Sequence, residues 1–216
     1  MVVQIQTLQT LIHGRYLVNS PHGTGPFPLL IGFHGYGELA EQQMERLQGI
    51  PGSNQWLLCS IQGLHAFYNR YNEPGAGWMT GMDREKRIQE NIRYIDSIVE
   101  KLVQTLPVSK TIVYAGFSQG TAMACRAAIL GKVEPLGVIL LGGDIPPEFD
   151  SLNRCQKILI GRGRRDRFYP YSRWRRDIER LKKSGLAHQT CEFDAGHIWH
   201  MEFAKAAGSF LSEIRP

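Results

Sequence analysis

The sequence of 216 residues lacks any apolar run close to the ~20 residues that a membrane-spanning helix needs. Residues 1–7 contain neither a basic segment nor a continuous apolar one, so we expect no signal peptide and a cytoplasmic location. No internal repeat, low-complexity tract or long linker interrupts the chain. We therefore expect a single domain over residues 1–216 rather than a helical membrane protein or a repeat array.

Cysteine is scarce, with four residues far apart in the sequence: Cys59, Cys125, Cys155 and Cys191. They have no metal-binding spacing, and three of them lie in segments that we expect to be buried. Reduced thiols inside the core are therefore the expected state.

The net charge is +5, but no nucleic-acid recognition motif accompanies it, so we expect no nucleic-acid partner. Many of the cations lie in one stretch: Arg162, Arg164, Arg165, Arg167, Arg173, Arg175, Arg176, Arg180, Lys182 and Lys183. Trp174, Ile178 and Leu181 fall at helical spacing there, which predicts an amphipathic helix with its charges in solvent. The alternative is that the arginines flanking Asp166, above all Arg164 and Arg165, form a rim that attracts anions.

Short apolar runs alternate with helical patterns along the chain, which is typical of an α/β fold. Strands are expected at 2–8 and 11–18 as an antiparallel edge, and at 28–33, 56–61, 111–115, 136–141, 157–161 and 190–193. Helices are expected at 38–47, 83–106, 121–130, 171–183 and 199–214, with an irregular excursion at 62–82. This order predicts a mostly parallel central sheet with helices on both faces and a ligand site beyond the carboxyl ends of the strands.

The segment Gly116-Phe117-Ser118-Gln119-Gly120 lies between the strand at 111–115 and the helix at 121–130. It is a G-x-S-x-G motif in a strand–turn–helix context, which is the context of a nucleophile elbow. Glycine on either side allows the sharp turn, and the serine hydroxyl is then exposed at the strand end. Ser118 is therefore the predicted nucleophile.

A serine hydroxyl needs a base within hydrogen-bond reach and an acid that orients the base. His197 follows the last strand and is the predicted base, with His200 as its rival. Asp166 follows the strand at 157–161 and lies between the serine and the histidine in the chain, as this fold requires. It is the predicted acid because the turn at 163–166 can aim its carboxylate at an imidazole. Asp144 and Asp150, in the preceding loop, are the alternatives.

An oxyanion hole in such a fold uses the backbone N–H after the nucleophile and one from the loop after an earlier strand. The N–H groups of Gln119 and Tyr36 fit these positions, the latter in His34-Gly35-Tyr36-Gly37. Six residues, mostly from the irregular excursion, are candidates for a wall that binds the acyl group, or else they cover the edge of the sheet: Phe67, Tyr68, Tyr71, Trp78, Met79 and Trp199.

Taken together, four motifs in this order resemble the phospholipase/carboxylesterase family of α/β-hydrolases, which includes the acyl-protein thioesterases: His34-Gly35-Tyr36-Gly37, Gly116-Phe117-Ser118-Gln119-Gly120, Gly163-Arg164-Arg165-Asp166 and Ala195-Gly196-His197. The resemblance covers nearly the whole chain and includes the segment 75–82 with Trp78, which it favours as a substrate contact. It implies a triad of Ser118, Asp166 and His197, and a hole formed by Tyr36 and Gln119. The loop at 144–156 leaves no room for a large cap domain.

The expected activity is hydrolysis of carboxylic esters or thioesters of small molecules through an acyl-enzyme, with neither metal nor cofactor. Acyl-protein thioesterase and lysophospholipase activities are the close alternatives. A peptidase and a non-catalytic binding protein on the same fold are the remote ones. The sequence leaves a homodimer open.

Overall fold

The computed structural model describes residues 2–149 and 154–214. The central sheet contains β1 (Tyr16–Asn19), β2 (Phe27–Phe33), β3 (Leu57–Ile61), β6 (Val108–Phe117), β7 (Gly137–Leu141), β8 (Lys157–Gly163) and β9 (Ala187–Phe193). The helices are α1 (Ala40–Gln48), α2 (Arg84–Thr105), α3 (Gln119–Leu130), α4 (Tyr171–Ser184) and α5 (Met201–Ile214), with a short 3-10 turn at Ser53–Gln55. A separate hairpin pairs β4 (His65–Tyr68) with β5 (Pro74–Gly77).

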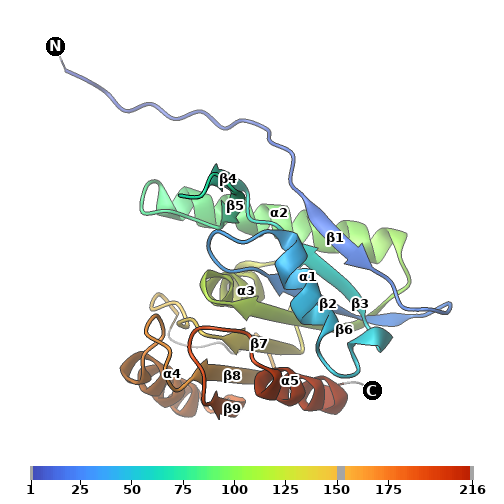
Figure 1. Ribbon diagram of the computed structural model, residues 1–216. Coiled ribbons are helices and arrows are strands. Elements are labelled where there is room, and N and C mark those ends of the chain that lie inside the picture. Colours follow the sequence, from blue (N-terminus) through green and yellow to red (C-terminus); the bar gives the residue numbers. More distant parts are fainter. Residues whose placement is uncertain (1, 150–153, 215–216) are drawn as a thin grey trace.

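The seven strands of the central sheet follow the order β1-β3-β2-β6-β7-β8-β9. Every neighbouring pair is parallel except β1 with β3, so the sheet is parallel apart from its antiparallel edge (Figure 1). The middle strands are buried on both faces, as in Leu29, Leu30 and Ile31 of β2. Continuous apolar runs are what a sheet covered on both sides requires.

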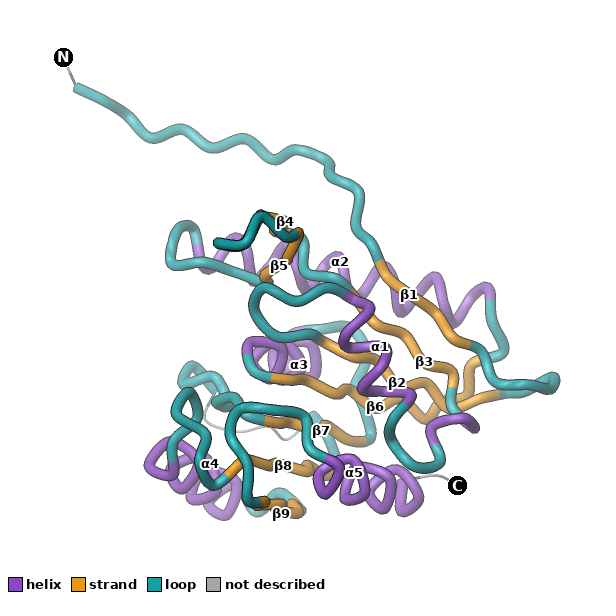
Figure 2. Tube along the Cα trace, in the orientation of Figure 1, coloured by secondary structure: helices purple, strands orange, loops and turns teal. Residues whose placement is uncertain are grey.

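Helices cover both faces of the sheet (Figure 2). Side chains of α2, α3 and α4 pack in one hydrophobic cluster, and side chains of α1 and α5 pack in the other. In α2, for example, Ile88, Ile92, Ile95 and Val99 recur at helical spacing and form the buried stripe. The expected α/β fold is confirmed, and no large cap is present in the described part of the chain.

Two expectations about the chain before residue 83 are wrong. Residues 2–15 contain no strand, and their apolar side chains are exposed on a segment that extends away from the sheet (Figure 1). Only β1 forms, because Tyr16–Asn19 alone pairs with β3. The excursion at 62–82 is also less irregular than expected, since it contains the β4–β5 hairpin, which an isolated bridge from Glu38 to Ala76 joins to the loop after β2.

Within the described residues, no helix has the length and apolarity needed to cross a bilayer. Nor do these residues include a group of three or more His, Cys, Asp or Glu side chains that could hold a metal ion. Cys59 and Cys125 are buried thiols, and burial raises the pKa of both well above the ordinary value.

Candidate active site

The turn between β6 and α3 has the geometry of a nucleophile elbow. Ser118 has φ 53° and ψ −118°, a conformation that L-residues rarely adopt and that costs about 1–3 kcal/mol. Its N–H donates to the carbonyl of Leu141, 2.9 Å away, which holds the strained turn against β7. The flanking glycines are sterically required, because a β-carbon at Gly120 would lie 2.0 Å from the carbonyl oxygen of Phe33 and one at Gly116 2.3 Å from that of Gly120.

The buried Asp166 and the half-buried His197 form a pair at the carboxyl ends of β8 and β9. Nδ1 of His197 donates to Oδ2 of Asp166 over 2.7 Å. The other carboxylate oxygen accepts the N–H groups of Phe168, at 2.8 Å, and Tyr169, at 2.9 Å. Burial alone would raise the pKa of Asp166, but the hydrogen bonds from His197 and from the Tyr169 N–H outweigh it and hold the pKa below its ordinary value. The carboxylate is therefore ionised and fixes the tautomer that leaves Nε2 as an acceptor.

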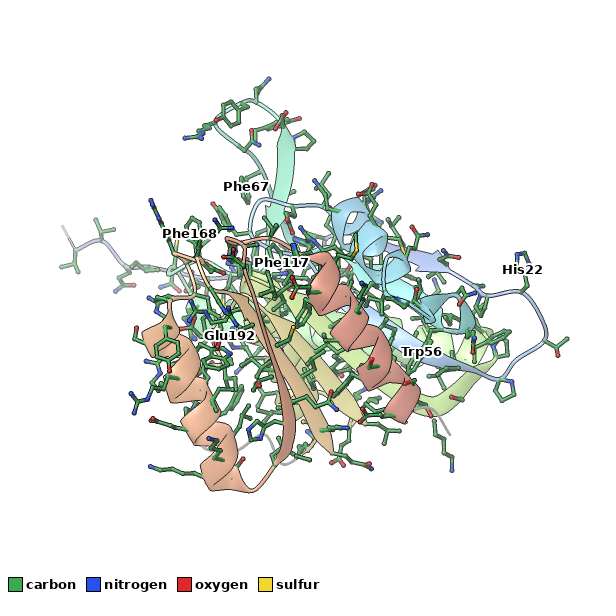
Figure 3. The ribbon with its side chains drawn as sticks, turned by 60° about the horizontal axis from the view of Figure 1, so that its bottom comes forward. His22, Trp56, Phe67, Phe117, Phe168 and Glu192 are labelled. Atoms are coloured by element: carbon green, nitrogen blue, oxygen red, sulfur yellow. The ribbon has the colours of Figure 1, made fainter. Side chains whose placement is uncertain are left out.

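The His197 ring lies beside the elbow. Its centroid is 5.0 Å from that of Phe117, the neighbour of Ser118, and 5.0 Å from that of Phe168. A β-carbon at Gly142 would lie 3.1 Å from Cε1 of His197, so the imidazole packs against Gly142, the residue that follows Leu141. Figure 3 shows Phe117 and Phe168 at the end of the sheet nearest the hairpin that carries Phe67.

Among the described residues, no hydrogen bond joins the Ser118 hydroxyl to Nε2 of His197. Catalytic hydrogen bonds are often long before substrate binds and shorten in the substrate complex.

The rival residues are engaged elsewhere. Arg173 and Arg176 each approach a carboxylate oxygen of Asp144 at 3.5 Å, so this acid pairs with α4 rather than with the histidine. The ring of His200 stacks on Phe193, with centroids 5.0 Å apart. Asp150 lies outside the described residues.

The loop after β2 is organised by a residue that sequence reasoning did not single out. His34 is fully buried, and burial lowers the pKa of its imidazole, which is therefore neutral. Its Nδ1 donates to the carbonyl of Gly35 at 2.6 Å, and its Nε2 accepts the N–H of Gly63 at 2.9 Å. The indole of Trp78 donates to the His34 carbonyl at 2.9 Å. The imidazole thus joins the loop after β2 to the chain after β3.

An ion pair supports the same loop from the side of α1. Oε2 of Glu38 accepts the N–H of Gly35 at 2.7 Å and the guanidinium of Arg46 at 2.6 Å. That guanidinium lies 4.2 Å from the centroid of the Phe117 ring, which connects this loop to the elbow. The N–H of Tyr36 is left without a hydrogen-bond acceptor among the described residues.

The side chain of Gln119 fastens the segment after β5 to the elbow. Its Oε1 accepts the N–H of Trp78 at 2.9 Å, and its Nε2 donates to the carbonyl of Met79 at 3.2 Å. Its backbone N–H, at the first turn of α3, is left for a ligand. The predicted pair of N–H donors at Tyr36 and Gln119 therefore remains unoccupied within the described structure.

The structure disperses the six residues suggested as an acyl-binding wall. Trp78 is fully buried against Phe33 and His34, so its ring has no surface for a substrate and instead supports the loop. Phe67 stacks on Tyr36, with centroids 5.0 Å apart. Tyr68 and Tyr71 are exposed on the hairpin, and the sulfur of Met79 contacts the guanidinium of Arg126 at 3.2 Å. Trp199 lines an open groove of about 780 Å³ with His197 and Phe117.

The arginines of the basic stretch that begins at Arg162 do not share one environment. Arg162 is buried, opposite Glu192 in the register of β8 with β9, and its guanidinium lies 3.6 Å from that carboxylate. Arg165 pairs with Asp194 at 3.2 Å. Arg164 is exposed. A rim built on Arg164 and Arg165 is thus partly neutralised.

A buried pair behind the acid leads to a first prediction. The hydroxyl of Tyr169 donates to Oδ2 of the fully buried Asp177 at 2.9 Å, and the N–H of Ile145 donates to the same oxygen at 3.2 Å. We expect Tyr169→Phe to lower the free energy of unfolding by about 1–3 kcal/mol in urea denaturation, because a buried carboxylate loses a donor. Tyr171→Phe is the control, since Tyr171 is exposed, and its effect should stay within about 0.5 kcal/mol. Equal effects of the two changes would contradict the role given to this pair.

Comparison with known proteins places this geometry in a family. A model described as Phospholipase/Carboxylesterase matches residues 20–214. No curated protein shows detectable sequence similarity to the chain. Among solved structures, a carboxylesterase of Bacillus cereus has a TM-score of 0.75 at 14% identity, over 94% of this chain and 95% of that one.

Two further structures are similar over comparable lengths. Acyl-protein thioesterase 2 of Zea mays has a TM-score of 0.68 at 19% identity, over 94% of this chain and 99% of that one. YahD, solved with malic acid, has a TM-score of 0.73 at 17% identity, over 94% and 100%. At such identities the likeness supports the fold, while the family model covers nearly all of the sequence. The chain therefore belongs to the phospholipase/carboxylesterase family of α/β-hydrolases, whose members hydrolyse ester bonds.

Proposed function

We propose that this chain is a serine hydrolase that cleaves carboxylic esters through a triad of Ser118, His197 and Asp166. The observation that carries the proposal is the His197–Asp166 hydrogen bond of 2.7 Å, placed with its ring 5.0 Å from Phe117 at the strained elbow. An ionised, buried acid that fixes Nδ1–H leaves Nε2 to take the serine proton.

The reaction then proceeds in two halves. Nε2 of His197 takes the proton of the Ser118 hydroxyl as the serine oxygen attacks the ester carbonyl. The N–H groups of Tyr36 and Gln119 donate hydrogen bonds to the resulting oxyanion. The imidazolium returns that proton to the leaving alcohol, which yields an acyl-enzyme. Water, activated by the same nitrogen, releases the acid. Asp166 stabilises the imidazolium throughout without taking its proton.

Thioesters of acylated proteins and lysophospholipids are the alternative substrates, and both agree with the family. The open groove of about 780 Å³ beside His197 favours an accessible site, because neither the hairpin nor a cap encloses it in the described part of the chain. A bulky leaving group can therefore reach the histidine from this side.

The test is a panel of p-nitrophenyl esters of increasing acyl length, measured beside acyl-thioesters of the same lengths. We expect saturable hydrolysis, with an initial burst of p-nitrophenol if deacylation is slow. If the properly folded protein hydrolysed neither the esters nor the thioesters, the hydrolase proposal would be wrong. Higher kcat/KM on long-chain thioesters would assign the chain to the thioesterase alternative.

A further inference from the structure

Two hollows flank the reacting groups, and they differ in which group they contain. The groove of about 780 Å³ is lined by His197, Phe117 and Trp199 but not by Ser118. A second cavity, of about 300 Å³, is lined by Ser118 and Gln119 but not by His197. A leaving group must lie beside the histidine that protonates it, whereas the acyl group stays on the serine. The smaller cavity is therefore on the acyl side.

Arginines line this smaller cavity. Arg126 of α3 is only 3% exposed, and its Nε and Nη2 reach the same oxygen of Glu148 at 2.9 and 2.7 Å. Arg84 approaches that oxygen too, at 3.3 Å. Two cations thus share one carboxylate.

A second carboxylate is shared by two cations in the same way. Arg173 lines the cavity, and both Arg173 and Arg176 approach Asp144 at 3.5 Å. The charged residues that line the cavity are Arg126, Arg173 and Asp144, so two cations and one carboxylate lie beside the nucleophile. At 3.5 Å the contacts with Asp144 are loose, so the guanidinium of Arg173 can turn towards another anion at little cost.

Apolar groups complete the walls. Phe168, Pro146 and Pro147 line the same cavity as the serine and the arginines. A lining that combines the nucleophile, apolar groups and guanidinium groups matches a short acyl chain that terminates in an anion. Planar guanidinium groups pair with a carboxylate through two hydrogen bonds.

We propose that the acyl pocket selects monoesters of short dicarboxylic acids, with the free carboxylate held between Arg126 and Arg173. The proposal rests on the proposed function, because it assumes that the acyl group is carried by Ser118. The reaction is hydrolysis: water replaces the alcohol, the acyl C–O bond breaks, and the products are the dicarboxylate and the alcohol. Arg126 and Arg173 take no part in bond breaking and determine only which acyl group binds.

The experiment compares ethyl hydrogen glutarate with ethyl pentanoate, which have the same acyl length and differ in the terminal carboxylate. The measured quantity is the ratio of the two kcat/KM values, obtained by following acid and ethanol release. We expect the native chain to favour the glutarate ester, and Arg173→Gln to lower the ratio roughly five- to tenfold, the effect of one charge-assisted contact that solvent weakens. Arg175→Gln is the matched control, because Arg175 lies on the same helix and pairs with Glu179, outside the cavity.

A second measurement separates this inference from the hydrolase proposal. Binding of ethyl hydrogen glutarate and of ethyl pentanoate to the Ser118→Ala variant is followed by ligand-observed NMR, with and without Arg173→Gln. Tighter binding of the glutarate ester that Arg173→Gln weakens supports the subsite even if the native chain turns over neither ester. Equal binding of the two esters, or equal kcat/KM ratios in the native chain and both arginine variants, overturns the subsite and leaves the hydrolase proposal standing.

Discussion

Replacing Ser118 by alanine is expected to lower kcat for a carboxylic ester by a factor of ~10⁴–10⁶. The change removes one oxygen, and with it the only group at the elbow that can form the acyl-enzyme. The turn itself should persist, because the 2.9 Å hydrogen bond from residue 118 to the Leu141 carbonyl uses the backbone. We therefore expect the loss to be confined to turnover, with the unfolding transition nearly unchanged.

Ser97→Ala is the matched control for this loss. The exposed Ser97 hydroxyl donates to the carbonyl of Arg93 on α2, and its removal should leave kcat unchanged. Both variants are compared by steady-state kinetics and urea denaturation. Residual activity of Ser118→Ala at more than a few per cent of the native value would show that another group is the nucleophile.

Replacing Asp166 by asparagine is expected to lower kcat by ~10⁴, because an amide no longer fixes the imidazole with Nδ1 protonated or stabilises the imidazolium. The shape of the side chain is kept, so the N–H groups of Phe168 and Tyr169 can still bond the amide oxygen. Asp144→Asn should lower kcat far less, because Asp144 pairs with arginines of α4. The reverse ranking of these two variants would refute the assignment of the acid.

Asp166 also makes a pH-dependent contribution to folding. Because the folded protein holds the pKa of this carboxyl below its ordinary value, the ionised form stabilises the fold above the unfolded pKa. That stabilisation is lost as the pH falls through the lower, folded pKa. We expect the stability difference between the native chain and Asp166→Asn to shrink on acidification from pH 7, as followed by urea denaturation. A difference that grew would contradict the sign of the pKa shift.

The sequence predicts the parts of the site that local spacing controls. Gly116 and Gly120 indicated the turn at Ser118, and the position of Asp166 and His197 after parallel strands brought the two together, as the structure shows. The carboxyl ends of parallel strands lie at the same edge of the sheet, whatever loops follow them. The order of strands and helices therefore predicted most of the fold, and the predicted boundaries differ from the observed ones by a few residues.

The rest depended on contacts that the sequence does not reveal. Arg162 looked like a solvent-facing charge, but the register of β8 with β9 puts it opposite Glu192 and inside. Trp78 was favoured as a pocket wall by the family resemblance, yet it is fully buried and its indole donates to the His34 carbonyl. Residues 2–15 have strand-like alternation at first, but no sheet edge in the described structure pairs with them.

The central claim is that the oxygen of Ser118 is the attacking group, and the most direct measurement is labelling by a fluorophosphonate probe followed by mass spectrometry of the digested protein. We expect a single stoichiometric adduct on the peptide that carries Ser118, formed rapidly by the native chain and strongly slowed in His197→Ala. Absence of an adduct, or an adduct on a different residue in the native chain, would contradict it.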